Sequence, residues 1–199
     1  GEGIVRLPLL GDFNVANALA AAACAVALGR PFGEILGRLD QAPQVPGRME
    51  RLAEVPAVVL RDYAHTPDAL ERALAALRPL TPGRLIVVFG CGGDRDRGKR
   101  PVMGRIAATL ADRAIVTSDN PRTENPAAII DDVEQGMGEV PHDREVDRRT
   151  AIAVALAGAG PEDTVLLAGK GHETYQVIGT EKLPFDEATI VRDLIGGRP

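Results

Sequence analysis

Runs of apolar residues alternate with helix-like stretches along most of this chain, and this alternation constrains the fold more than any other feature. The run at residues 85–89 is unbroken, as expected of a strand that is covered on both faces. Other strand-like runs lie at 57–62, 114–117 and 164–168, and helix-like stretches lie at 67–80, 101–111, 126–137, 149–157 and 187–195. The alternation predicts an α/β fold with a Rossmann-like, doubly wound and mostly parallel sheet.

The first 44 residues have a different pattern. Residues 4–10 are typical of a strand, residues 11–29 of an Ala-rich helix that Asp12 or Asn14 caps and Gly29 ends, and residues 31–42 of a second helix. Two Pro and one Gly between residues 42 and 47 then suggest an interdomain linker. We therefore expect one domain boundary, between residues 1–44 and 45–199. Near the other end, residues 175–183 predict a hairpin that turns at residues 179–180.

Composition excludes several classes of protein. The 199 residues suffice for one large domain or for one domain and a piece of another, and 45% hydrophobic residues can form a core. A net charge of −5 argues against sequence-independent nucleic-acid binding. No apolar run is long enough for membrane insertion, and no signal-peptide pattern is present, so we expect a cytoplasmic protein. Because the sequence opens in mid-pattern on Gly rather than Met, we expect a fragment of a longer protein.

Four polar segments follow the expected strands. They occupy residues 62–70, 89–101, 118–122 and 168–173, and they bring Arg, Asp, His, Lys and Glu side chains together with flexible Gly backbone. The carboxyl ends of parallel strands lie at one edge of a sheet, where open α/β folds bind their ligands. We therefore expect these segments to form one site. The two cysteines have neither disulfide nor metal-ligand spacing.

The Gly-rich segment at residues 89–101 is not a standard phosphate loop. Gly93 to Lys99 has the spacing of a P-loop, but Arg100 stands where Ser or Thr would hold magnesium. Arg95 occupies the third glycine position of a dinucleotide-binding motif. The segment could carry the guanidinium of Arg95 to a ligand, or it could be a solvated charged loop.

Residues 118–122 suit the recognition of a zwitterion. Asn120 precedes Pro121 and is therefore biased towards an extended conformation that ends the strand. Asp119 can accept from an ammonium group, and the planar guanidinium of Arg122 can pair with a carboxylate. An ordinary turn with an Asp–Arg surface pair is the alternative.

In residues 168–173, Gly169 and Gly171 allow close approach of the backbone, while Lys170 and Glu173 supply charge. A single His after a strand, such as His65, is more often structural than catalytic. No arrangement of Ser, His and Asp, or of Cys and His, suggests a nucleophile.

The order of several motifs is more specific than any one of them. G-x-F-N-x-x-N-x-L-A-A, P-G-R-M-E, D-Y-A-H-T-P-D-A-L, F-G-C-G-G-D-R-D-R-G-K-R-P-x-M, D-N-P-R and G-K-G-H-E follow one another over nearly the whole chain. This series resembles the C-terminal part of the Mur ligases, most closely the members that add the third amino acid to the peptidoglycan precursor. The resemblance implies that residues 1–44 end the central ATPase domain and that residues 45–199 form the C-terminal Rossmann-like domain.

The resemblance also implies a set of ligand-binding residues. For the nucleotide, Asn17 would contact adenine, Arg48 would reach the ATP phosphates, and Asp62 and His65 would line the same side of the C-terminal domain. The amino-acid pocket would consist of Arg95, Asp119, Asn120, Pro121, Arg122, Gly169 and Glu173. In this family D-N-P-R marks enzymes that add meso-diaminopimelate, since the Arg pairs with the distal carboxylate and lysine-adding relatives lack it.

The family reaction consumes ATP and forms an amide bond through an acyl-phosphate on UDP-N-acetylmuramoyl-L-Ala-D-Glu. The P-loop, the carboxylated lysine and the magnesium ligands of the family have no counterpart here. The resemblance therefore implies ATP and Mg²⁺ as cofactors, with the metal ligands outside this chain, and no catalytic residue is assigned within it. The alternatives are a relative that adds L-lysine or another amino acid, a non-catalytic amino-acid-binding module, and a dinucleotide-dependent oxidoreductase. The last is disfavoured by the missing glycine motif.

Overall fold

A computed structural model describes residues 2–197, which form two compact units. The first unit ends at Val45 and the second begins at Pro46, within the segment whose composition suggests a linker. The assignment of these units to two Mur ligase domains stays a prediction.

The first unit holds two helices, α1 (Asp12–Ala27) and α2 (Phe32–Asp40). The predicted side-chain caps of α1 are wrong, because Gly11 is its N-cap and no side chain bonds there. Asn14 instead lies inside the first turn, where its Nδ2 donates to the carbonyl of Leu10 at 2.7 Å. Gly29 adopts a φ of 77° just after the helix, as expected of a residue that ends it.

The strand expected at residues 4–10 is not formed. A strand needs a partner for its backbone groups, and no described segment pairs with these residues. The backbone N–H of Arg6 donates instead to Oδ1 of Asp40 at 3.0 Å, and Pro8 has no N–H to donate. The hydrogen bond from Arg6 to the Asp40 side chain and the missing N–H of Pro8 are therefore consistent with the absence of a strand at these residues.

The second unit is built on a six-stranded sheet in the order β1-β2-β6-β3-β4-β5. Its strands are β1 (Glu50–Ala53), β2 (Val58–Asp62), β3 (Leu85–Phe89), β4 (Arg113–Val116), β5 (Asp143–Arg144) and β6 (Thr164–Ala168). All neighbours are parallel except β1 and β2, which are antiparallel. The sequence pattern did not predict the short edge strands β1 and β5.

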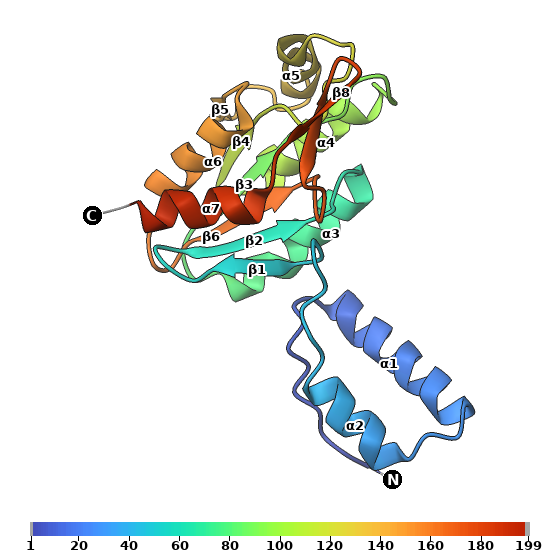
Figure 1. Cartoon of the computed structure of the whole chain (residues 1–199). Coiled ribbons are helices and arrows are strands. Elements are labelled where there is room, and N and C mark those ends of the chain that lie inside the picture. Colours follow the sequence, from blue (N-terminus) through green and yellow to red (C-terminus); the bar gives the residue numbers. More distant parts are fainter. Residues whose placement is uncertain (1, 198–199) are drawn as a thin grey trace. The chain divides into compact units, whose positions relative to one another are not determined.

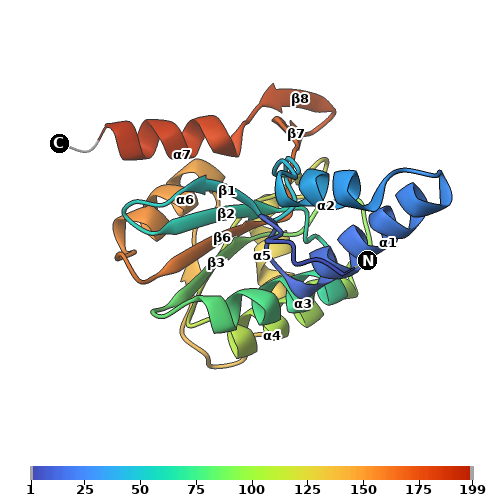
Figure 2. The same ribbon diagram turned by 90° about the horizontal axis from the view of Figure 1, so that it is seen from below.

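Helices cover both faces of this sheet. They are α3 (Pro67–Leu77), α4 (Lys99–Leu110), α5 (Pro126–Glu134), α6 (Arg148–Ala157) and α7 (Glu187–Gly196), with a 3₁₀ turn at Arg78–Leu80. In Figure 2, α3 and α4 lie below the sheet, and α6 and α7 lie above it. The doubly wound, mostly parallel sheet predicted from the sequence is confirmed. No helix in the described part of the chain is long and apolar enough to cross a bilayer.

The strands and helices share an aliphatic core. All five residues of β3 and of β6 are buried, and Leu70, Leu74 and Leu77 of α3 are also buried. On the other face, a cluster that includes Ile86 of β3, Ile152 of α6 and Ile190 of α7 packs between the sheet and these two helices. This core gives the strand ends a rigid support.

A two-stranded hairpin of β7 (Tyr175–Ile178) and β8 (Glu181–Pro184) follows β6, as the sequence pattern predicts. The N–H of Gly179 donates to the carbonyl of Arg122, and the N–H of Arg122 donates to that of Val177. The hairpin is therefore bonded to the D-N-P-R segment.

Candidate functional site

A cavity of about 420 Å³ lies at the carboxyl ends of the central parallel strands. All four polar segments contribute to its lining, which comprises Tyr63, His65, Thr66, Gly92, Arg95, Asp96, Lys99, Asp119, Asn120, Arg122, Gly169 and Glu173. The wall thus carries both cationic and anionic side chains. This is the edge at which a doubly wound sheet binds its ligands.

Of the predicted site residues, the cavity brings together His65, Arg95, Asp119, Asn120, Arg122, Gly169 and Glu173. Pro121 is buried beside it and does not line it. Asp62 and Arg48 belong to the same unit but lie outside the lining. Asn17 lies on the exposed surface of α1 in the other unit, where its Nδ2 donates to Oδ1 of Asn14 at 3.2 Å.

Asn120 connects two of the polar segments. Its Nδ2 donates to Oε2 of Glu173 at 2.9 Å, and its Oδ1 accepts from the N–H of Val177 at 2.9 Å. Nζ of Lys170 donates to the same Oδ1 at 3.1 Å. The amide therefore has a single orientation that satisfies all three partners.

Arg122 has a constrained backbone and side chain. Its φ of 51° is in the left-handed region, which a non-glycine residue rarely adopts. Nη1 donates to the carbonyls of Gly93 at 2.8 Å and Asn120 at 3.3 Å. These bonds hold the guanidinium at the cavity wall, where the same group can pair with an anionic ligand.

The Gly-rich loop that carries Arg95 packs directly on the D-N-P-R backbone. A Cβ at Gly93 would lie 1.9 Å from the carbonyl oxygen of Pro121, so this position admits only glycine. Arg95 itself is exposed, and its Nη1 donates to the carbonyl of Asp94 at 3.0 Å. The loop therefore places the exposed guanidinium of Arg95 at the cavity.

Glu124 holds the Gly-rich loop in place through contacts with Asp94, Arg97 and Arg100. Its two carboxylate oxygens accept from Arg100 at 2.8 and 3.0 Å, and Oε1 also accepts from the N–H of Asp94 at 2.6 Å. Arg97 adds an ion pair at 2.9 Å. The hydrogen bond from Arg100 is the main reason why the pKa of Glu124 falls to about 2. Glu124 stays ionised at all pH values near neutrality.

A second group of residues, the Tyr63 cluster, consists of Arg48, Tyr63, His65 and His172. The ring centroid of Tyr63 lies 4.4 Å from that of His65 and 5.8 Å from that of His172. The guanidinium carbon of Arg48 lies 5.1 Å from the Tyr63 ring centroid. These are ring and cation–π contacts, which suit a flat ligand or one that carries negative charge.

Asp62 supports the turn that carries Arg48. Its Oδ2 accepts from the N–H of Met49 at 2.8 Å, and the residue is 9% exposed. Burial raises the pKa of Asp62, and the backbone hydrogen bond from Met49 partly offsets this effect. In this structure Asp62 therefore acts on the turn rather than on the cavity.

The backbone at Gly171 explains how this turn meets the last polar segment. Gly171 has a φ of 53°, and a Cβ there would lie 2.7 Å from Cβ of Tyr63 and 3.0 Å from the carbonyl oxygen of Gly47. Only glycine permits both the conformation and the contact.

Sequence reasoning did not assign Lys170, Tyr63 or Lys99 to the site. The side chain of Lys170 is fully buried behind Asp119, Asn120 and Glu173. Nζ of Lys99 donates to the carbonyl of His65 at 2.7 Å. The position of Lys170 between two glycines after a strand is the one signal that could have indicated it.

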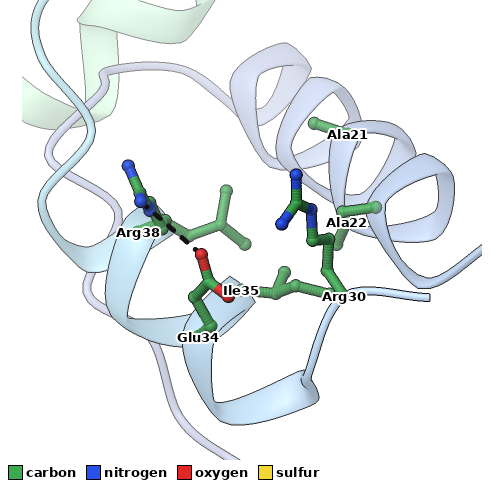
Figure 3. Close-up of a pocket in the computed structure, with 8 residues that line it drawn as sticks. Ala21, Ala22, Arg30, Glu34, Ile35 and Arg38 are labelled. Atoms are coloured by element: carbon green, nitrogen blue, oxygen red, sulfur yellow. Dashed lines mark ion pairs between the residues drawn. The ribbon is translucent and has the colours of Figure 1, made fainter. Parts of the chain in front are cut away.

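A second cavity, of about 430 Å³, belongs to the first unit and is lined by α1 and α2 (Figure 3). Its polar side chains are Arg30, Glu34 and Arg38, of which the last two form an ion pair at 3.5 Å.

No group of three or more His, Cys, Asp or Glu residues in positions 2–197 could hold a metal ion.

Comparison with known proteins gives consistent results. The family model "Mur ligase, glutamate ligase domain" matches residues 47–171. A UDP-N-acetylmuramoyl-L-alanyl-D-glutamate--2,6-diaminopimelate ligase from Thermosynechococcus vestitus is 54% identical over 202 residues, covering 100% of this chain and 41% of the relative. The ligase of the same name from Parasynechococcus marenigrum is 57% identical over 194 residues, covering 94% of this chain and 39% of the relative.

Solved structures of related ligases also match this chain. A structure of a UDP-N-acetylmuramoyl-L-alanyl-D-glutamate--2,6-diaminopimelate ligase matches with a TM-score of 0.76 and 42% identity, over 98% of this chain and 41% of that one. E. coli FolC in complex with ADP matches with a TM-score of 0.64 and 26% identity, over 84% of this chain and 38% of that one. The chain thus spans about two fifths of the length of these curated relatives. Since the family model matches more than half of the chain, this protein belongs to the Mur ligase family and contains its glutamate ligase domain.

Proposed function

We propose that this chain is part of a cytoplasmic, ATP-dependent ligase that joins meso-diaminopimelate to UDP-N-acetylmuramoyl-L-Ala-D-Glu. In this proposal, residues 1–44 end the central ATPase domain and residues 45–199 supply the amino-acid pocket and part of the nucleotide site. The observation that carries it is a single cavity whose charged lining includes Arg95 and Arg122 together with Asp119 and Glu173. That set complements an amino acid with an extra carboxylate.

The acidic side of the cavity suits the amino group of the ligand. Oδ1 of Asp119 is buried; it lies 3.5 Å from Nζ of Lys170 but accepts no hydrogen bond from any residue in the described part of the chain. A buried acceptor without a hydrogen bond is costly, so an ammonium group of the ligand there would supply one. Glu173 lies nearby through Asn120 and can share the same ligand group.

The arginine side of the cavity suits the carboxylates. Arg122 would pair with the distal carboxylate of diaminopimelate, which lysine lacks, and Arg95 would act on a carboxylate of the same zwitterion. Lysine would leave the Arg122 guanidinium without an anion. Selectivity would therefore come both from a gained pair and from an unpaired charge.

The Tyr63 cluster would form part of the nucleotide side. Arg48 would reach the ATP phosphates and His65 would line the same side, while Asp62 would act by holding the turn that carries Arg48. Asn17 of the first unit would contact adenine. Magnesium would neutralise phosphate charge when bound, and no described residue of this chain is assigned to it.

The reaction class follows from these substrates. The terminal carboxylate of the UDP-dipeptide attacks the γ-phosphorus of ATP, ADP leaves, and an acyl-phosphate results. The unprotonated amine of diaminopimelate then attacks the acyl carbon, and phosphate leaves as the amide forms. In these two steps, the role of this chain is to hold and orient the amino acid. This positioning removes much of the entropic cost of the second step.

Membership of the Mur ligase family removes the alternative of a dinucleotide-dependent oxidoreductase. An amino-acid-binding module without catalysis remains as a description of the isolated chain, because the cavity is complete within the second unit.

Calorimetric titration of the 199-residue chain with meso-diaminopimelate and with L-lysine tests the proposed substrate. We expect diaminopimelate to bind and lysine to bind at least about tenfold more weakly, since a paired guanidinium is replaced by an unpaired one. Equal binding of the two amino acids would remove the assignment of diaminopimelate, and tighter binding of lysine would favour a lysine-adding relative.

A further inference from the structure

We propose that Lys170 is a positioning residue of the amino-acid pocket. Its ammonium group holds Asp119, Asn120 and Glu173 in the arrangement that receives the amino group of the substrate. This inference rests on the proposed function and adds a residue to it.

Lys170 lies behind the cavity and does not line it. Its side chain has no exposed surface, and the cavity wall in front of it is formed by Asp119, Asn120 and Glu173. A lysine is almost never fully buried unless its charge is paired. The residue therefore cannot touch the substrate directly and has to act through its partners.

Each polar partner recorded for the Lys170 ammonium lines the cavity. Nζ lies 3.1 Å from Oδ1 of Asn120, 3.4 Å from Oε2 of Glu173 and 3.5 Å from Oδ1 of Asp119. The ring of Phe185 lies on the apolar side, with its centroid 5.8 Å from Nζ. The ammonium thus joins the loop after β4 to the loop after β6 at one point.

The charges explain why an ammonium is needed there. Asp119 and Glu173 both approach the same atom, so without Lys170 the two carboxylates would repel each other. Two negative charges and one positive charge leave one negative charge, which matches one substrate ammonium group. A receptor held in this form before binding loses less freedom when the ligand enters.

Another buried ion pair shows what a purely structural arrangement looks like. Arg148 and Glu187 are both fully buried and pair at 2.8 Å. Arg148 also donates to the carbonyl of Ala168 at 2.9 Å. None of these three residues lines the cavity. Lys170 differs because its charge is directed at three lining side chains.

The test is a double-mutant cycle on the 199-residue chain, read by calorimetry with meso-diaminopimelate as the titrant. Lys170→Met keeps most of the side-chain volume and removes the charge, and we expect binding to weaken at least about tenfold. In a Glu173→Gln background the same change should weaken binding by less than about threefold, because one of the carboxylates that it holds is already neutral. A merely structural role would lower affinity equally in both backgrounds, and that result would overturn the proposal.

Lys182→Met is the matched control. Lys182 is exposed on β8, where its Nζ lies 4.3 Å from the ring centroid of Tyr175, and its loss should change affinity by less than about twofold. If Lys170→Met does not fold, as judged by its thermal melt, Lys170→Gln is used, since its amide can still donate to Asn120. Failure of both variants to fold would assign Lys170 to the fold and overturn the proposal.

The two proposals fail in different ways. A wild-type chain that binds no diaminopimelate would overturn the proposed substrate. A wild-type chain that binds it, beside a folded Lys170→Met variant with affinity within twofold, would overturn only the role of Lys170.

Discussion

The two groups of residues that we propose for the amino acid and for the nucleotide, called here the amino-acid side and the nucleotide side of the site, are built in different ways. On the amino-acid side, Asn120, Arg122 and Glu173 are held by hydrogen bonds of 2.8 to 2.9 Å that link the D-N-P-R segment to the Gly-rich loop, to residues 168–173 and to β7. On the nucleotide side, the Tyr63 cluster depends on ring contacts, and Arg48 is exposed.

This contrast shows which half of the site the chain specifies by itself. A bonded network of buried and half-buried polar groups has one geometry, and the ligand can use it without rearrangement. An exposed arginine on a tyrosine ring keeps its rotamer freedom until a ligand fixes it. We therefore expect ligand binding by this chain to be strong for the amino acid and weak for the nucleotide.

The largest expected effect is the absence of turnover. The sequence contains the proposed amino-acid pocket but no P-loop to hold the ATP phosphates, and phosphoryl transfer depends on such positioning. We expect no phosphate release above background when the purified chain is given ATP, magnesium, the UDP-dipeptide and diaminopimelate. Phosphate release that depends on both the dipeptide and diaminopimelate would show that this chain binds ATP productively. That result would contradict the expected difference between the amino-acid side and the nucleotide side.

The next largest effect is expected from single substitutions on each side of the site, made in the longer protein of which we propose this chain is a part. Arg122→Ala should lower kcat/KM for diaminopimelate by at least about a hundredfold, because it removes a guanidinium–carboxylate pair. It should leave KM for ATP nearly unchanged. Arg48→Ala is the matched variant and should give the reverse pattern, with the larger effect on ATP. If Arg122→Ala leaves the preference for diaminopimelate over lysine unchanged, Arg122 is not its cause.

The central part of the fold could be predicted because its signals are local. Residues 85–89 and 164–168 form β3 and β6 with the expected bounds, since continuous aliphatic runs suit strands that are buried on both faces. The edge strands β1 and β5 are short and polar, and they exist because β2 and β4 offer them open edges. The sequences of β1 and β5 do not by themselves indicate this pairing.

The site could be predicted in outline for a topological reason. Parallel strands end at one edge, so segments far apart in the sequence meet there without any signal of their own. The direction of each side chain was not predictable. Lys170 lies behind the lining side chains that it contacts, and Arg122 donates to the carbonyl of Gly93. Both arrangements depend on contacts between segments that are far apart in the sequence.

The smallest expected effect concerns Glu124, which supports the amino-acid side through the Gly-rich loop. Glu124→Gln should weaken diaminopimelate binding by about threefold, because the loop that carries Arg95 loses its charged anchor. The same change should alter the acid stability. The folded-state pKa of Glu124 is about 2, below its ordinary value of 4.5, so its contribution is complete above pH 4.5 and is lost as pH falls to 2.

Asp163 provides the control for this prediction. Its pKa is also lowered to about 2, chiefly by the hydrogen bond from Arg84, but it lies before β6 at the opposite end of the sheet from the cavity. Thermal melts between pH 2 and 5 should therefore show a shallower pH dependence in both Glu124→Gln and Asp163→Asn. Only Glu124→Gln should weaken ligand binding at pH 7. If Asp163→Asn weakens binding equally, the loss reflects general stability, and the amino-acid side is less independent of the rest of the sheet than its hydrogen bonds indicate.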